Sequence, residues 1–285
     1  MTQLKREIEH ILKPSLKDSE KTWLNSPMIF ITGPRQVGKT YQTKLMSKVY
    51  YNWDTKEVKK AFSKDHYFFR TGARWVIFDE IHKRKDWKKL LKGYFDSPNR
   101  TENFIVTGSG RFNLYQKGGD SLQGRYDLFH LYPMTLDEYT SNCGSPLTRN
   151  FETWEPLSND KSSQEQELIK LGGFPEPLLR GTEAHLNKWL DLYLQRLIEE
   201  DIRDFSKVEL VDKIELLARL LPSRVGSPIS FQSIAKDVEA ARESIKTWMR
   251  LMEILYFGFF IPPYSRRIER AVKREKKWYF FQWAF

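Results

Sequence analysis

The chain has 285 residues and a formal net charge of +10; hydrophobic residues make up 40% of it and aromatic residues 14%. The single cysteine, Cys143, excludes a disulfide framework and a cysteine-based metal site. The sequence has no apolar run as long as a membrane span and no signal-peptide pattern, so we expect a cytoplasmic globular protein without a membrane partner.

Residues 1–26 are predicted to form an amphipathic helix and a polar connector. The chain then alternates short apolar strands with helical stretches up to about residue 139, which predicts an α/β fold with a parallel sheet. We assign residues 27–145 to this P-loop core. Its first strand is expected at Met28–Thr32, a short apolar run of the kind that central parallel strands have.

Residues 33–40 read GPRQVGKT, which matches the Walker A pattern G-x-x-x-x-G-K-[ST]. In such a loop the backbone N–H groups point at phosphate oxygens, and the glycines let the backbone come close to them. Lys39 would reach the β- and γ-phosphates, and the Thr40 hydroxyl would bind Mg²⁺. An ordinary glycine-rich turn between a strand and a helix is the alternative. The predicted nucleotide-binding residues are Gly33, Pro34, Arg35, Gln36, Val37, Gly38, Lys39, Thr40 and Tyr41.

A second apolar strand, expected at residues 75–78, ends in the acids Asp79 and Glu80. A P-loop enzyme requires an aspartate at the end of a neighbouring strand to hold Mg²⁺, and often a glutamate beside it to activate water. We therefore predict that Asp79 holds Mg²⁺ together with Thr40 and that Glu80 is the catalytic base. A buried strand that ends in a solvated acidic turn is the alternative.

A third strand is expected at residues 104–109 and turns polar at its end. Because ligands bind at the carboxyl ends of the strands in such folds, Ser109 is predicted to face the nucleotide or the attacking water. The alternative is that Ser109 only ends the strand in a turn.

The glycine-rich loop at residues 118–125 carries Arg125, which could contact the γ-phosphate in its own chain or across a subunit interface. Arg111 is a competing candidate for this role. An ion pair between Arg125 and an acid such as Asp120 or Asp127 is the alternative that gives Arg125 no catalytic part.

A polar stretch rich in Gly, Pro and Asn follows the core and marks a boundary. We assign residues 146–205 to a helical lid, with a rigid turn at residues 172–177 and a long helix at about residues 184–205. Another helix is expected at residues 210–221, within a third region that spans residues 206–285.

The pattern of the region 206–285 is typical of a winged helix. Ser230 is expected to cap a short helix, and a second helix follows at about residues 241–255. Apolar, β-prone runs at residues 256–261 and 278–281 then form a two-stranded hairpin.

One face of the second of these helices presents Arg242, Lys246 and Arg250 at four-residue spacing. Such a row could contact DNA in the major groove or at its phosphates, and the positive net charge permits this. A winged helix used only for packing or for contact with a protein partner is the alternative.

These segments together resemble a family of prokaryotic AAA+-like P-loop ATPases that carry a C-terminal domain of unknown function. The matching segments are residues 31–40 (ITGPRQVGKT), 78–83 (FDEIHK), 106–109 (VTGS), 121–125 (SLQGR), 131–133 (LYP) and 172–175 (GGFP). The resemblance implies an AAA+-type nucleotide domain, a helical lid and a winged helix. Family members usually continue into a domain with a restriction-endonuclease-like fold. This chain has Gln282 where the family tends to have an acid, so we expect a short or truncated member without nuclease activity.

The motifs together predict an ATPase that uses ATP and Mg²⁺ and couples hydrolysis to motion of the winged helix. The predicted catalytic residues are Lys39, Glu80, Ser109 and Arg125. The alternative is a nucleotide-gated DNA-binding module with little turnover. Besides ATP, the candidate partners of the chain are DNA, a second copy of the chain and another protein. A small-molecule kinase is less well supported, because we find no acceptor-site base and no set of lid arginines.

Overall fold

The computed structural model of the protein describes residues 28–97, 101–108, 110, 122, 124–140, 162–202, 211–264 and 274–285. The predicted helix at residues 1–26 therefore lies outside the described residues. The chain divides into two compact units, Met1–Glu165 and Gln166–Phe285, and each is described by itself. The boundaries expected at residues 145 and 205 fall in stretches that the structure does not describe, so they stay predictions.

Within the described residues, five parallel strands form the sheet of the first unit, in the order β2-β3-β4-β1-β5. In chain order they are β1 (Met28–Thr32), β2 (Tyr50–Asn52), β3 (Trp75–Asp79), β4 (Asn103–Thr107) and β5 (Asp127–His130). The predicted α/β fold with a parallel sheet is confirmed. Because the strands are parallel, the loops that follow β1, β3 and β4 all lie at the carboxyl ends of the strands, on the same side of the sheet.

The strand order corrects the expectation that the strand carrying Asp79 is the neighbour of the Walker A strand, β1. The strand that carries Asp79, β3, is not hydrogen-bonded to β1, because β4 lies between them and pairs with both. The register places Thr107 of β4 beside Ile31 on one side and beside Asp79 on the other. A side chain from β4 therefore occupies the space between the Walker A strand and the acid.

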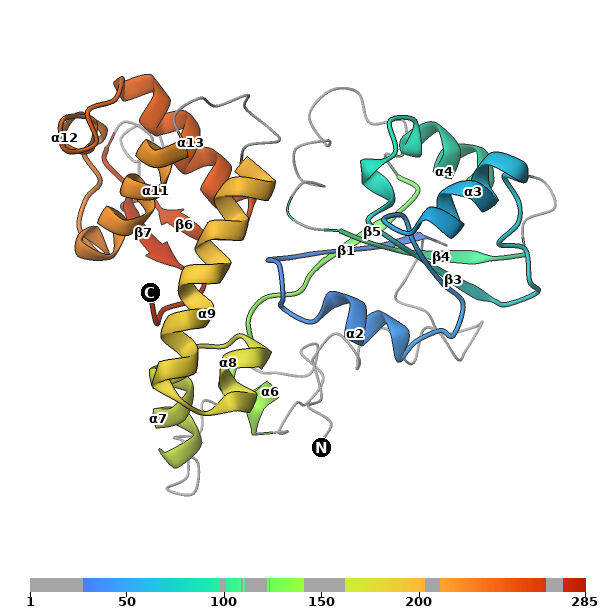
Figure 1. Ribbon diagram of the computed structural model, residues 1–285, viewed down its shortest axis with the longest axis horizontal. Coiled ribbons are helices and arrows are strands. Elements are labelled where there is room, and N and C mark those ends of the chain that lie inside the picture. The colour runs from blue at the N-terminus through green and yellow to red at the C-terminus, as the bar shows by residue number, and fades with distance from the viewer. Residues whose placement is uncertain are drawn as a thin grey trace. The chain divides into compact units, whose positions relative to one another are not determined.

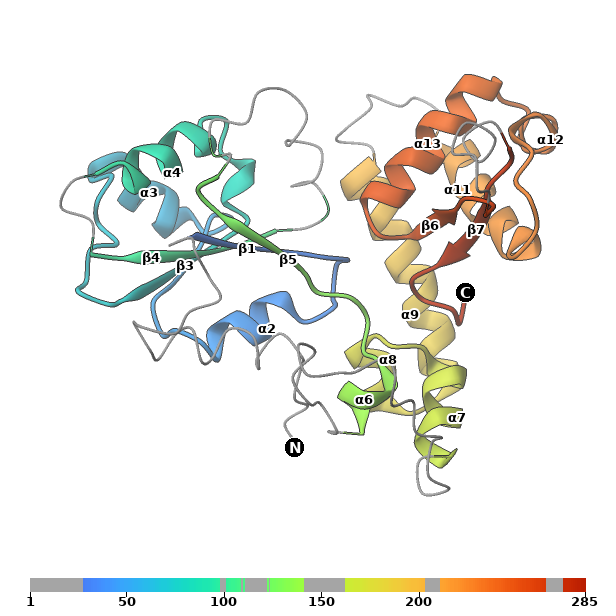
Figure 2. The same cartoon turned by 180° about the vertical axis from the view of Figure 1, so that it is seen from behind.

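Helices cover both faces of this sheet (Figure 1, Figure 2). One face carries α2 (Lys39–Lys44), and the other carries α3 (Lys56–Lys64) and α4 (Trp87–Phe95); a short helix, α6 (Leu136–Tyr139), follows β5. Successive strand residues point to opposite faces, so every second residue of β1, β3 and β4 joins the core beneath α3 and α4.

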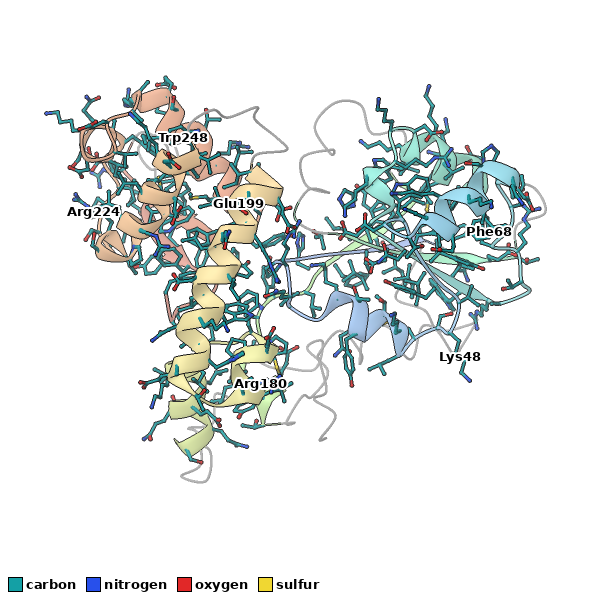
Figure 3. The ribbon with its side chains drawn as sticks, viewed as in Figure 1. Lys48, Phe68, Arg180, Glu199, Arg224 and Trp248 are labelled. Carbon is teal, nitrogen blue, oxygen red and sulfur yellow. The ribbon has the colours of Figure 1, made fainter. Side chains whose placement is uncertain are left out.

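That core is rich in aromatic rings. Phe69 lies at its centre, with ring centroids 4.5 Å from Tyr94, 5.4 Å from Phe78 and 5.6 Å from Phe104. Phe68, labelled in Figure 3, packs edge-on against Phe62 at 4.8 Å. Edge-to-face and tilted pairs of this kind stabilise a core beyond the area they bury, so this face fixes the strands that carry the site on the opposite face.

The second unit is mainly helical. Its described elements are α7 (Ser162–Leu171), α8 (Pro175–Arg180), α9 (Glu183–Arg196), a π-helical segment (Leu197–Ile202), α11 (Val211–Leu220), a 3₁₀ turn (Leu221–Arg224), α12 (Phe231–Asp237), α13 (Arg242–Ile254), β6 (Gly258–Ile261) and β7 (Lys277–Phe280). The two short helices followed by the antiparallel pair β6 and β7 appear in the predicted order, and the Ser230 hydroxyl accepts the N–H of Ser233 as the expected cap.

Two helix predictions need correction. The rigid turn expected at residues 172–177 is shorter, because α8 begins at Pro175; proline suits the first turn of a helix, where its missing N–H costs nothing. The helix expected at residues 184–205 changes to a π-helical segment at Leu197. None of the helices in the described part of the chain has the length and apolar character that a bilayer crossing requires.

The GGFP motif finds a structural role in this unit. The side-chain amide of Gln282 is 1% exposed, accepts the N–H of Gly173 at 3.2 Å and donates to the carbonyl of Leu171 at 3.0 Å. Gly172 has a φ of 76°, and a Cβ there would lie 1.8 Å from Oε1 of Gln282. The turn between α7 and α8 is thus held by a residue more than a hundred positions later in the chain.

We predict that Gln282→Ala lowers the free energy of unfolding by about 2–4 kcal/mol, because it leaves two buried backbone groups without partners. Urea unfolding of the full chain measures this. Gln195→Ala, which changes an exposed glutamine of α9, is the matched control and should stay within about 0.5 kcal/mol of wild type. Equal stability of Gln282→Ala and the control would contradict the proposed anchor.

Candidate nucleotide site

The loop of residues 33–38 joins β1 to α2, so the predicted strand and helix do flank it. Two of its glycines are required by the backbone. Gly33 has a φ of 155°, and a Cβ there would lie 2.1 Å from the carbonyl oxygen of Leu131. Gly38 has a φ of 98° and precedes the first residue of α2, where no side chain caps the helix. The glycine positions of the motif are therefore explained by geometry alone.

Lys39 is buried and folds back across this loop. Its ammonium donates to the carbonyls of Gly33 at 3.0 Å and Pro34 at 2.6 Å. The positive charge of Lys39 therefore lies at the loop. The oxygens of an anion bound there could accept hydrogen bonds from the ammonium in place of the two carbonyls. Tyr41, also predicted to bind the nucleotide, has a side chain that is 55% exposed.

The carboxylate of Asp79 is the centre of the site. It is 4% exposed, and among the described residues three hydroxyls donate to it. Oδ2 accepts from Thr40 at 2.9 Å and from Tyr50 at 2.7 Å, and Oδ1 accepts from Thr107 at 2.5 Å. The fold thus brings together the two residues that the sequence assigned to Mg²⁺, Thr40 and Asp79.

The donor set fits a magnesium ion. Carboxylate and hydroxyl oxygens are hard ligands, and Mg²⁺ in nucleotide sites is bound by one or two protein groups plus substrate phosphates. No cluster of three or more His, Cys, Asp or Glu side chains suited to a metal occurs in the described ranges. The site therefore fits an ion that arrives with a phosphate ligand, rather than a closed protein cage.

Glu80 follows Asp79 and lies just past the end of β3. Its φ of 57° turns the chain into a 3₁₀ turn at Ile81–Lys83, and its N–H donates to the carbonyl of Thr107 at 3.0 Å. Burial raises the pKa of the Glu80 carboxyl; the charge of Lys83, whose Nζ lies 3.5 Å from Oε2, opposes this rise, and Asp79 adds to it. Glu80 is therefore a stronger base than an exposed glutamate.

Comparison with known families identifies this unit. Residues 25–140 match the family described as "AAA domain", and residues 163–283 match a domain of unknown function (DUF8612). The chain therefore carries an AAA domain followed by a domain of unknown function. The AAA match contains all five strands of the sheet, the loop and α2, and these elements carry the residues around Asp79.

Two curated relatives are described as uncharacterized proteins. MJ1544 of Methanocaldococcus jannaschii is 25% identical over 195 residues, which are 67% of this chain and 43% of that protein. Rv2008c of Mycobacterium tuberculosis is 20% identical over 258 residues, 89% of this chain and 54% of that protein. The chain thus spans about half the length of the curated relatives it matches.

Two solved structures show partial likeness. The Aeropyrum pernix ORC1 protein in complex with DNA has a TM-score of 0.38 and 14% identity, with 97% of this chain and 88% of that chain covered. The Bacillus subtilis DNA clamp loader delta protein has a TM-score of 0.35 and 12% identity, with 87% and 88% covered. Neither likeness is close enough to carry an argument about function.

Two site residues of the AAA domain were missed by sequence reasoning. Thr107 could have been found, because it is the last residue of β4 and a hydroxyl there faces the end of β3. Tyr50 gave no signal, because β2 has three residues and none of them is fully buried. Its ring lies 4.1 Å from Nζ of Lys44 in α2. Burial, together with the hydrogen bond to Asp79, raises the pKa of the Tyr50 hydroxyl.

Other predicted residues of the AAA domain are placed differently. Ser109 and Arg111 lie outside the described residues. Arg125 donates from Nε to Asp96 at 3.2 Å, and its guanidinium lies 5.5 Å from the centre of the Phe95 ring.

Strand register decides which loop Arg125 can reach. Asp127 pairs with Ile29, so Arg125 lies near the N-terminal end of β1. The phosphate loop follows the C-terminal end of β1, roughly 20 Å away at about 3.3 Å per residue. Arg125 therefore cannot reach the phosphate loop of its own chain, whereas a role across a subunit interface stays a prediction.

The basic row of the second unit is brought together as expected. Arg242, Lys246 and Arg250 all lie on α13 and line one groove of about 520 Å³. Lys246 forms an ion pair with Glu243 at 2.7 Å.

We predict that Tyr50→Phe lowers the free energy of unfolding by about 1–3 kcal/mol, because the buried Asp79 carboxylate loses a hydrogen-bond donor. Tyr51→Phe is the matched control: this neighbour has no recorded hydrogen bond from its hydroxyl within the described part of the chain. Chemical unfolding of both variants tests the prediction. A Tyr50→Phe protein as stable as Tyr51→Phe would show that Asp79 does not depend on this donor.

We predict that Glu80→Gln raises the stability of the nucleotide-free protein near pH 8. The folded pKa of Glu80 lies above its ordinary value of 4.5, so ionisation of Glu80 opposes folding as the pH rises through the folded pKa. The gain should shrink as the pH falls towards 4.5. Thermal unfolding across this range measures it, and a variant less stable than wild type at pH 8 would show that the pair with Lys83 outweighs burial.

Proposed function

We propose that this chain binds ATP and hydrolyses it with the help of Mg²⁺. The observation that carries the proposal is the 2.9 Å contact between Thr40 and Asp79, beside the phosphate-type loop and next to Glu80. A strand-end carboxylate, a hydroxyl at the start of the loop helix and an adjacent carboxyl with a raised pKa suit phosphoryl transfer to water.

Each residue has a separate task in this proposal. The ammonium of Lys39 and the loop amides bind the phosphate chain, and their positive charge stabilises negative charge that develops on the γ-phosphoryl oxygens. Thr40 and Asp79 would hold Mg²⁺, which would supply positive charge beside the phosphates. The hydrogen bond between the two side chains supports this assignment, because both reach the same point.

Glu80 is the proposed general base. It accepts a proton from a water molecule whose oxygen bonds to the γ-phosphorus as the bond to the β–γ bridging oxygen breaks, so ADP and phosphate result. Lys83 lies 2.5 Å from Asp54 and 3.5 Å from Glu80, and this bridge orients the Glu80 carboxylate. A base with a raised pKa holds the proton more firmly, which favours the transfer.

Two further roles complete the proposal. Ser109, which follows β4 directly after Gly108, senses the γ-phosphate. Arg125 would act in trans, because it lies too far from the loop of its own chain to reach it. Hydrolysis in such an assembly would move the helical region and the proposed winged helix formed by α12, α13, β6 and β7.

A nucleotide-gated DNA-binding module with little turnover is the second candidate. The basic row on α13 favours it, because such a row has no part in hydrolysis. Turnover separates the two candidates, since a gated binder would exchange nucleotide without consuming it.

We predict that Glu80→Gln lowers the turnover number about 10²–10⁴-fold with ATP affinity nearly unchanged, because only the base is removed. Lys39→Ala should instead weaken ATP binding about tenfold or more, since a charged hydrogen bond contributes about 1.5–3 kcal/mol. Phosphate release and binding of a fluorescent ATP analogue measure these effects. Glu57→Gln, an exposed position of α3, is the matched control. Wild-type protein that binds ATP but releases no phosphate at any protein concentration, with or without DNA, would contradict hydrolysis.

We predict that a mixture of Arg125→Ala and Lys39→Ala regains turnover that neither variant has alone, because a mixed interface joins an intact loop to an intact arginine. Asp96→Asn controls for stability, since it breaks the same ion pair and keeps the arginine. If the mixture stays inactive while Asp96→Asn is as impaired as Arg125→Ala, Arg125 is structural only.

A further inference from the structure

The groove beside α13 gathers basic residues from distant parts of the sequence. Its described lining has Arg242, Lys246 and Arg250 from α13, with Arg274 and Lys276 from the segment that leads into β7. The N–H of Ile229 donates to the carbonyl of Lys276 at 2.9 Å, which fixes this segment beside the start of α12. The two basic sets therefore belong to one surface of one compact unit.

The groove keeps a net positive charge, because its acids are fewer than its basic residues. The lining has two acids, Glu253 and Glu275. The carboxylate of Glu253 accepts a hydrogen bond from the backbone N–H of Phe260 in β6 at 3.3 Å. Lys246 is paired with Glu243. Arg242, Arg250, Arg274 and Lys276 are exposed, and no acid of the described ranges lies within ion-pair distance of them.

We propose that this groove binds double-stranded DNA, with α13 facing the major groove and the basic residues on both sides contacting phosphates. The inference rests on the second candidate function, DNA binding by the basic row, and deepens it; it does not depend on ATP hydrolysis, because none of these residues belongs to the nucleotide site. Several exposed cations on one surface match a polyanion, and phosphate contacts are the main source of affinity for DNA.

The dimensions of α13 favour a duplex. Its basic row runs from Arg242 to Arg250, which is eight steps along the helix or about 12 Å at 1.5 Å per residue. An α-helix with its side chains is about 10–12 Å across, and the major groove of B-DNA is about 12 Å wide. The deep and narrow major groove of an RNA helix would not admit α13.

The aromatic residues of the groove argue against a single strand as the main ligand. Single strands bind where ring faces are open for base stacking. Here Phe260 packs edge-on against Trp278 at 4.8 Å and against Phe231 at 6.2 Å. Because these rings pack against one another, they offer no open face for base stacking. Binding at this groove would therefore depend on charge.

Fluorescence anisotropy with the full chain and a labelled mixed-sequence duplex of about 25 base pairs tests the proposal. The logarithm of the wild-type affinity should fall with the logarithm of salt with a slope between about −3 and −5, and Arg242→Ala and Arg250→Ala should each reduce that slope by about 1. Lys246→Ala should have a smaller effect, because Glu243 already neutralises this charge, and Glu243→Gln should tighten binding.

Controls separate the duplex from other polyanions. Arg219→Ala removes a charge from α11, where Arg219 pairs with Glu215 at 2.9 Å outside this groove, and should leave binding unchanged. A single strand of the same length and poly-glutamate should bind about tenfold or more weakly. Equal loss in Arg219→Ala and Arg242→Ala, tighter binding of poly-glutamate or the single strand, or no duplex binding at low salt would each overturn the proposal. ATP turnover of the α13 variants without DNA reports separately on the nucleotide site.

Discussion

The buried carboxylate of Asp79 is the constraint on which the first unit depends. A carboxyl group that is 4% exposed is costly to bury unless hydrogen bonds replace those it makes with water. The hydroxyls of Thr40, Tyr50 and Thr107 supply those bonds from α2, β2 and β4. One charge at the end of β3 therefore ties together the loop helix, an edge strand and the central strand.

The same interaction links the stability of the site to its proposed activity. The Thr40 hydroxyl donates to Asp79, and the Lys39 ammonium donates to the carbonyls of Gly33 and Pro34. Both groups are the ones that a metal–phosphate ligand would engage. Binding would therefore exchange internal partners for ligand atoms, with little need to build the site anew. Glu80 lies in a left-handed turn just beyond these groups.

Sequence reasoning reached the parts of this structure that local patterns determine. Apolar runs located β1, β3 and β4, the glycine and lysine spacing located the loop, and Ser230 located the start of α12. It did not reach features that depend on distant partners. The insertion of β4 between β1 and β3, and the contact of Tyr50 with Asp79, follow from strand order. The position of Arg125 near the N-terminal end of β1 follows from the register of β5 on β1. The hydrogen bonds between Gln282 and the GGFP turn join residues that are over a hundred positions apart.

The most direct test of this account is the effect of Mg²⁺ on ATP affinity in wild type and in Asp79→Asn, measured by titration with and without a chelator. If Asp79 and Thr40 form the metal site, Mg²⁺ should tighten ATP binding to wild type about tenfold or more, which is about 1.4 kcal/mol. Asp79→Asn should bind ATP equally well with and without Mg²⁺, whereas the exposed control Asp65→Asn should behave as wild type. An Asp79→Asn protein that keeps the full Mg²⁺ effect would contradict the account.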